Sequence, residues 1–264
     1  MPSVEILNEA RRAIEICNAC RYCEGYCAVF PAMERRRIFS DSDMSYLANL
    51  CHNCRGCFYA CQFSPPHEYN VNIPAQFSAL RAQTYQDYAW PGALGKLFER
   101  NGLVVSLVMA VSLMVVMGLA LLMVNDGRLF GVHTGAGAFY AVIPYEVMVY
   151  TASAVFGFVV LAMIIGFTRF LKDTGKTSVG NVDTSSLLSA VWDVLTMKNL
   201  KGGGLGCNYP DHRFSPARRW HHHFVMYGFF LCFAATSVAT IYDHVFDWQA
   251  PYAYTSLPVI LGTL

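Results

Sequence analysis

Charged residues are scarce in this chain. They make up 14% of its 264 residues, against about 25% in an ordinary soluble protein. Hydrophobic residues account for 55%, which excludes a disordered segment and argues against an ordinary soluble enzyme. The formal net charge is only +1, so the chain as a whole does not attract a nucleic acid electrostatically. The composition therefore favours a membrane protein with no nucleic-acid partner.

A secretory signal peptide is also missing, because residues 1–12 (MPSVEILNEARR) contain no long apolar run. Ten cysteines are nevertheless present, and eight of them lie between Cys17 and Cys61. In a secreted mini-domain such a set predicts disulfides, whereas in a reducing compartment it predicts metal binding. We therefore expect metal ligands rather than disulfides.

The charges that are present divide the chain into two parts. Residues 1–100 hold 10 of the 19 Lys and Arg residues and 10 of the 18 Asp and Glu residues. We therefore expect a polar domain over residues 1–95, followed by a membrane domain over residues 100–264.

Long apolar stretches predict where the membrane domain crosses the bilayer. Uncharged or nearly uncharged segments occur at about 103–124, 147–167 and 224–242. The first of them would measure about 33 Å as a helix, enough to span the hydrocarbon core. A fourth span begins at 256, but the residues that follow are too few to cross a membrane. We therefore expect the chain to be truncated at its C-terminus.

The distribution of basic residues predicts the orientation of these spans. The 168–221 loop carries eight Lys or Arg residues, whereas the 125–146 connection carries only Arg128 and residues 243–255 carry none. By the positive-inside rule, the N-terminal domain and the 168–221 loop share the cytoplasmic side. The eight basic residues are Arg169, Lys172, Lys176, Lys198, Lys201, Arg213, Arg218 and Arg219.

Eight cysteines form an internal repeat with a period of 34 residues. Each half reads C-x2-C-x2-C-x3-C and follows a stretch with helical periodicity. The predicted helices cover residues 4–15, a segment from Ser40 or Asp41 through Leu50, and a segment after Asn72 to about Tyr88. We expect an all-helical domain with cysteine loops between the helices. The two runs are Cys17, Cys20, Cys23 and Cys27, and then Cys51, Cys54, Cys57 and Cys61.

This spacing is typical of a pair of [4Fe–4S] clusters. Two-residue gaps wrap three cysteines around one cube, whereas the cysteine after a three-residue gap points toward the neighbouring cluster. The two runs therefore exchange their fourth ligands. The first cluster takes Cys17, Cys20, Cys23 and Cys61, and the second takes Cys51, Cys54, Cys57 and Cys27. A pair of zinc sites is the alternative, but zinc usually takes two cysteine pairs separated by a longer spacer.

Histidines flank the third predicted span. His222 and His223 precede it and His244 follows it, with helical offsets of about 40° and about 60° between the two ends. One helix face thus presents an imidazole at each membrane boundary, as two b-type haems stacked across a bilayer require. The alternative is that the histidines only anchor the helix at the interface.

A glycine-rich segment, Lys201-Gly-Gly-Gly-Leu-Gly-Cys-Asn, precedes this span. It lacks the context of a phosphate-binding loop, because no strand precedes it and no Gly-Lys-Ser/Thr ending follows. We expect a tight turn that packs against the cysteine domain or a haem edge. The sequence also contains no flavin fingerprint and no catalytic triad, which indicates an electron-transfer subunit rather than a stand-alone catalyst.

The twin cysteine runs, the glycine-rich loop and the Trp220-His-His-His start of a span together resemble the tricarballylate-utilisation B and citrate-utilisation B family. The resemblance covers essentially the whole chain. It implies an all-α protein with a dicluster ferredoxin-like domain and a cytochrome b-like bundle of transmembrane helices in the bacterial inner membrane. It also implies iron–sulphur clusters and haem that pass electrons from a partner flavoprotein dehydrogenase acting on tricarballylate to the membrane quinone pool.

Two other functions remain open at this point. A subunit related to heterodisulphide reductases or respiratory reductases would carry the same cofactors and run electrons in the opposite direction. A membrane adaptor stabilised by zinc would have no redox role. Colour distinguishes the adaptor, because iron–sulphur clusters are brown and zinc sites are colourless.

Overall fold

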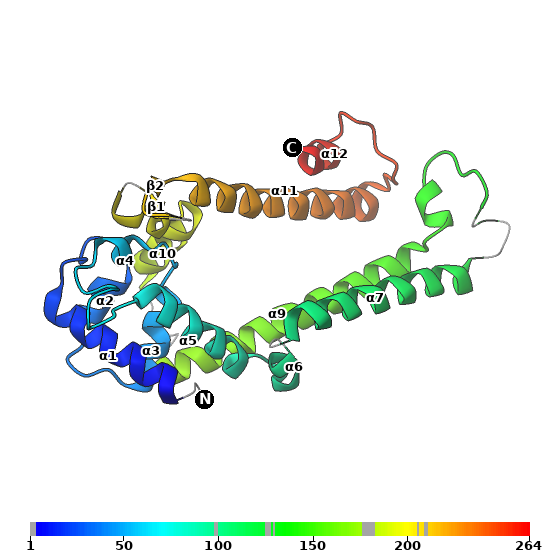
Figure 1. Ribbon diagram of the computed structural model, residues 1–264. Coiled ribbons are helices and arrows are strands. Elements are labelled where there is room, and N and C mark those ends of the chain that lie inside the picture. The colour runs from blue at the N-terminus through cyan, green and yellow to red at the C-terminus, as the bar shows by residue number, and fades with distance from the viewer. Residues whose placement is uncertain are drawn as a thin grey trace. The chain divides into compact units, whose positions relative to one another are not determined.

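The structure is a computed structural model that describes residues 4–97, 100–124, 128, 130–175, 183–204, 206–208 and 211–264 (Figure 1). The described part is helical except for one two-stranded sheet. This confirms the predicted all-α fold class. The chain forms two compact units, one containing Met1–Lys96 with Ala162–His223, and the other Leu97–Leu161 with Phe224–Leu264. The segment after the second predicted span therefore packs with the N-terminal domain.

Three helices build the core of the first unit: α1 (Val4–Cys20), α3 (Asp41–Leu50) and α5 (Ile73–Tyr88). α5 contacts both of the others, and the short helices α2 (Val29–Glu34) and α4 (Gly56–Ala60) complete the domain. Because each long helix carries apolar residues on one face, these faces meet and exclude water. The most deeply buried side chains are Ala10, Ala13, Ile14, Met33, Met44, Leu47, Phe77 and Leu80.

Local capping explains where two of these helices begin. Ser40 accepts a hydrogen bond from the Asp43 backbone N–H, and the Asp43 carboxylate accepts one from the Ser40 backbone, which together form a capping box before α3. Asn72 caps α5 by accepting from Ala75 at 3.2 Å, and Pro74 occupies the first turn. Both predicted helices are confirmed with their caps.

Replacing Ser40 with alanine should lower the free energy of unfolding by about 1 kcal/mol, because a backbone N–H at the start of α3 loses its acceptor. Thermal unfolding of the detergent-solubilised chain, followed by circular dichroism, measures the change. Ser42→Ala is the matched control, since the Ser42 hydroxyl is hydrogen-bonded to the Ser40 hydroxyl and not to a backbone amide. Equal losses in both variants would contradict the capping assignment.

α1 continues five residues beyond the helix that was predicted over 4–15. No glycine or proline interrupts residues 16–20, so the helix runs on until Arg21, whose backbone is left-handed at φ 55°. The Arg21 N–H donates to the Cys17 carbonyl at 2.8 Å and closes this end. As a result, Cys17 and Cys20 lie on the last turn of α1 rather than in a loop.

The glycine-rich segment contains one of the two strands in the described part of the chain, and the other strand follows it. η4 (Lys198–Gly204) leads into β1 (Cys207–Asn208), which pairs antiparallel with β2 (Phe214–Ser215). Gly206 lies between η4 and β1 and has a φ of +115°. A Cβ at this position would lie 2.6 Å from the Ser215 carbonyl. Only glycine fits this position without displacing the backbone. α10 (Thr184–Leu195) precedes this segment.

Among the described residues, three helices are long and apolar enough to cross a membrane: α7 (Asn101–Met123), α9 (Tyr145–Thr174) and α11 (Ala217–Phe246). The three apolar segments predicted as spans are therefore helical. In the second unit, Phe156 of α9 stacks on Phe233 of α11 with ring centroids 6.0 Å apart.

α9 and α11 extend beyond the predicted spans. α9 ends directly before Gly175, whose backbone is left-handed at φ 60°, and α11 begins directly after Pro216. Parts of the predicted 168–221 loop are therefore helical. The short α12 (Leu257–Thr263) begins where a fourth span was expected, with Pro258 in its first turn.

Loop charge predicts that residues 125–146 and 168–221 lie on opposite sides of the membrane. Of the basic residues behind this prediction, Lys176 lies outside the described residues. Reporter fusions at Gly131 and Gly203 should therefore report opposite compartments, with the Gly203 fusion cytoplasmic. Two cytoplasmic reporters would rule out α9 as a span.

Candidate functional site

Four cysteines from both runs line one cavity of about 280 Å³. Cys17 and Cys20 come from the last turn of α1, Cys23 from the following loop, and Cys61 from the residue after α4. Cys27 does not line this cavity. The fourth thiol in this cavity thus comes from the second run. Most of the other lining residues are apolar, among them Ile16, Phe30, Phe63 and Val71, and the remainder include Arg21 and Gln62.

The other four cysteines form a second group. Cys51 directly follows α3, Cys54 lies in the next loop, Cys57 is on α4, and Cys27 lies before α2. Cys57 lies close enough to the other three to interact electrostatically with each of them, and also with Cys23 of the first group. Cys27 interacts in the same way with Cys51 and Cys54. The structure therefore groups Cys27 with the second run.

Burial and mutual repulsion favour the protonated form of several of these thiols when no cation is bound. Burial, with a smaller contribution from neighbouring thiolates, raises the pKa of Cys17 to about 12 and that of Cys23 to about 11. Burial also raises the pKa of Cys27 to about 12 and that of Cys57 well above its ordinary value. Such thiols become thiolates when a positively charged metal centre binds.

The donor set fits two [4Fe–4S] clusters. The eight thiols fall into two sets of four, and each set combines three cysteines of one run with one of the other. Among the residues that the structure describes, no three Cys, His, Asp or Glu side chains surround one point as ligands of a single metal ion.

The glycine-rich segment packs against the second cysteine group. The Asn208 N–H donates to the Cys54 carbonyl at 2.9 Å. A Cβ at Gly202 would lie 3.3 Å from the Cys207 Cα and 3.9 Å from the Cys54 sulphur, and one at Gly56 would lie 3.5 Å from the Gly202 carbonyl. The expected turn against the cysteine domain is confirmed.

Cys207, on β1, lies beside this group although the sequence placed it outside the two runs. Its side chain is 1% exposed, packs with Cys54 and Leu200 in one buried cluster, and donates its S–H to the Leu200 carbonyl at 3.3 Å. The neighbouring Cys207 thiol is the main cause that lowers the pKa of Cys54 below its ordinary value. In the sequence, only the position of Cys207 directly after the glycine run pointed to a role in the site. Its partner is revealed only by the tertiary contact.

Two arginines add positive charge around the second group. Arg81 donates to the Cys51 carbonyl, and Arg218 donates from Nη1 to the Asn53 carbonyl at 2.5 Å. Arg218 belongs to the first turn of α11, so this bond attaches the start of that helix to the cysteine loop. Its charge also favours the thiolate form of Cys54.

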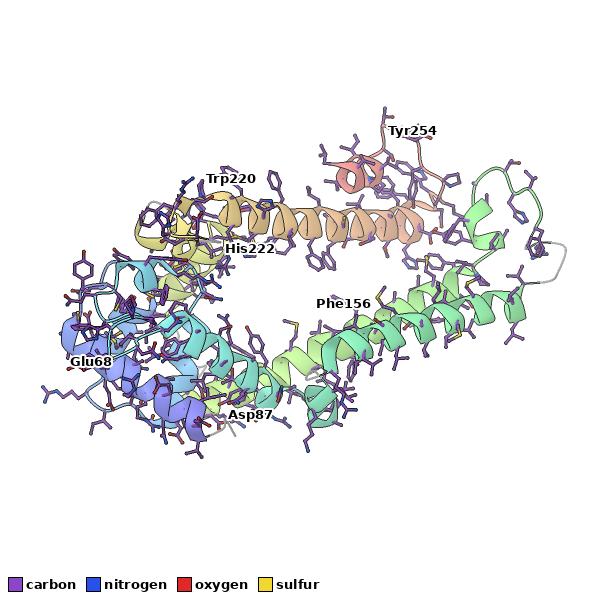
Figure 2. All side chains as sticks on the ribbon, viewed as in Figure 1. Glu68, Asp87, Phe156, Trp220, His222 and Tyr254 are labelled. Atoms are coloured by element: carbon purple, nitrogen blue, oxygen red, sulfur yellow. The ribbon has the colours of Figure 1, made fainter. Side chains whose placement is uncertain are left out.

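The histidines predicted as haem ligands occupy the two ends of α11, so the helix does not bring them together. Trp220 and His222 lie in its first turns (Figure 2), and the His223 ring packs edge-on against Trp220 at 5.9 Å. His222 interacts electrostatically with His52, which lies next to the second cysteine group. The pKa of His52 is lowered, and burial is the main cause. His222 therefore lies on the side of the second group.

His244, at the far end of α11, is hydrogen-bonded to Tyr145. The Tyr145 hydroxyl and His244 Nε2 are 2.7 Å apart, and the rings pack edge-on. The bond orients the imidazole through its Nε2 nitrogen.

A helical domain with two four-cysteine groups, joined to helices of membrane type, is typical of membrane-associated iron–sulphur electron-transfer proteins. Residues 10–87 match the family described as Citrate utilization protein B Fer4-like domain, and residues 96–264 match Citrate utilization protein B. The chain belongs to the citrate utilization protein B family. It is 44% identical over 257 residues to Citrate utilization protein B of Escherichia coli, which covers 97% of this chain and 66% of that protein. No solved structure matches the chain.

Proposed function

We propose that the chain reoxidises a flavoprotein dehydrogenase and delivers the electrons to the quinone pool of the bacterial inner membrane. The partner dehydrogenase would act on tricarballylate or a related tricarboxylate. Two [4Fe–4S] clusters and b-type haem, when bound, supply the one-electron steps between a two-electron flavin and a quinone.

The observation that carries this proposal is the pair of crossed cysteine groups. Cys61 stands with the first run and Cys27 with the second, which is the ligand exchange typical of two neighbouring cubane clusters. The chain contributes the thiolates, and most of them are kept from water by burial. The surface of the cytoplasmic domain would contact the partner flavoprotein. Cys20 is exposed at the first group, which favours that group as the one nearer the partner.

The position of the second group supports its role as the exit toward the membrane. Arg218 attaches the loop around Asn53 to the first turn of α11, and His222 on that helix lies near His52. His222 or His223 would hold a haem at the cytoplasmic boundary and His244 one at the opposite boundary. Their second axial ligands would come from other helices.

Purified protein tests the proposal at three levels. We expect a brown preparation with broad absorption near 400 nm, about eight irons per chain, and a b-type band in membranes that contain the whole protein. Added quinone should reoxidise the reduced protein. A colourless preparation containing zinc would support the adaptor instead, and net electron flow from quinol to the flavoprotein would support a reductase subunit.

A further inference from the structure

The Cys207 thiol lies beside two acceptors. Its S–H donates to the Leu200 carbonyl at 3.3 Å, and its side chain packs with Cys54 in the same buried cluster. A charged thiolate is a stronger acceptor than a neutral carbonyl. When Cys54 binds a metal centre as a thiolate, the Cys207 S–H is therefore directed to it.

Cys207 is not a fifth ligand of the second group. Cys57 interacts with Cys27, Cys51 and Cys54, so four thiols are already together. Cys207 approaches that group through Cys54. It is held at this place by the β1–β2 pairing and by the bond from the Asn208 N–H to the Cys54 carbonyl.

Arg218 places a positive charge beside Cys54, which also favours the thiolate form of that ligand. Its guanidinium is fixed to the Asn53 carbonyl, one residue before Cys54. The cavity of the first group contains Arg21 as its basic residue, and this side chain bonds to Asn18 on the exposed surface. Water screens an exposed charge of this kind, whereas the Arg218 side chain is partly buried.

Hydrogen bonds and positive charge near a ligand sulphur stabilise the more negative, reduced form of a cluster. We propose that Cys207 is a positioning residue that donates its S–H to Cys54 and, together with Arg218, raises the reduction potential of the second cluster above that of the first. This inference rests on the proposed function. One electron then passes from the first cluster to the second, so that the first cluster becomes oxidised and the second becomes reduced. Cys207 keeps its proton throughout.

The test is a redox titration of the full chain in detergent, followed by electron paramagnetic resonance. In Cys207→Ala, the ratio of reduced to oxidised second cluster at a fixed potential should fall about tenfold, equivalent to about 59 mV for a one-electron couple. Cys207→Ser keeps a donor and should restore part of the shift. Arg218→Gln should also lower the second potential, and none of these changes should move the first.

Cys232→Ala is the matched control, because Cys232 lies exposed on α11 and belongs to neither group. Two unchanged potentials in Cys207→Ala would overturn the proposal. If Cys207→Ala loses iron, the Cys207→Ser variant distinguishes a donor from a ligand. A Cys207→Ser protein with full iron and an intermediate potential of the second cluster supports the donor role. A Cys207→Ser protein that also loses iron shows that Cys207 is a ligand, which overturns the proposal. A wild-type chain that binds zinc instead of iron would refute the proposed function itself, which is a different result from unchanged potentials.

Discussion

The Cys61→Ser variant should retain about half of the wild-type iron and lose the cluster associated with the first cysteine run. Cys61 lines the same cavity as Cys17 and Cys20, so its thiolate completes that group although it lies in the second run. A serine hydroxyl is a poor ligand for cluster iron, because soft thiolates are the donors that iron–sulphur clusters select. Iron analysis combined with electron paramagnetic resonance measures the loss.

Two comparison variants identify which cluster has been lost. The Cys61→Ser spectrum should match that of Cys20→Ser, because both residues belong to the first group. Cys27→Ser should instead match Cys54→Ser, because both belong to the second. A Cys61→Ser spectrum that matches Cys54→Ser would show that each run binds its own cluster without exchange.

Replacing His222 and His223 together should abolish the haem on the cytoplasmic side and leave both cluster signals intact. The first turns of α11 present these imidazoles next to the second cysteine group, and a neutral imidazole is a good ligand for haem iron. The variant should still accept electrons into its clusters but fail to pass them from flavin to quinone. Reduced-minus-oxidised spectra and stopped-flow reduction of membranes separate these two effects.

His221→Ala is the matched control for this variant. The His221 ring is hydrogen-bonded through Nδ1 to the Ala217 carbonyl of its own helix at 2.7 Å, so its loss should leave the haem band unchanged. A whole protein without any b-type band would contradict the haem assignment. Electrons would then have to pass from the second cluster to quinone directly.

Helix positions were predictable where local chemistry determines them. Ser40 and Asn72 mark the starts of α3 and α5 because their side chains bond to backbone within the next three residues. The end of α1 was not predictable in this way. It depends on Arg21 adopting a left-handed backbone, and arginine has no preference for that conformation that a sequence pattern reveals.

The cysteine spacing predicted the grouping that the side chains adopt, since a three-residue gap rotates the fourth thiol away from the other three. Cys207 was missed for a physical reason. It reaches Cys54 through a contact between segments more than 150 positions apart, and nothing in the local sequence specifies such a contact. The β1–β2 pairing was missed because each strand has only two residues, too few for an alternating pattern.

The placement of Cys61 in the first group has a consequence for biosynthesis. Because that group draws its last member from the second run, the nascent chain cannot complete it while only the first run has left the ribosome. Both groups instead become complete together, once the second run has been made. The same exchange suits an origin by gene duplication, in which two copies of a single-run ancestor first shared thiols across a symmetric dimer and were later joined in one chain.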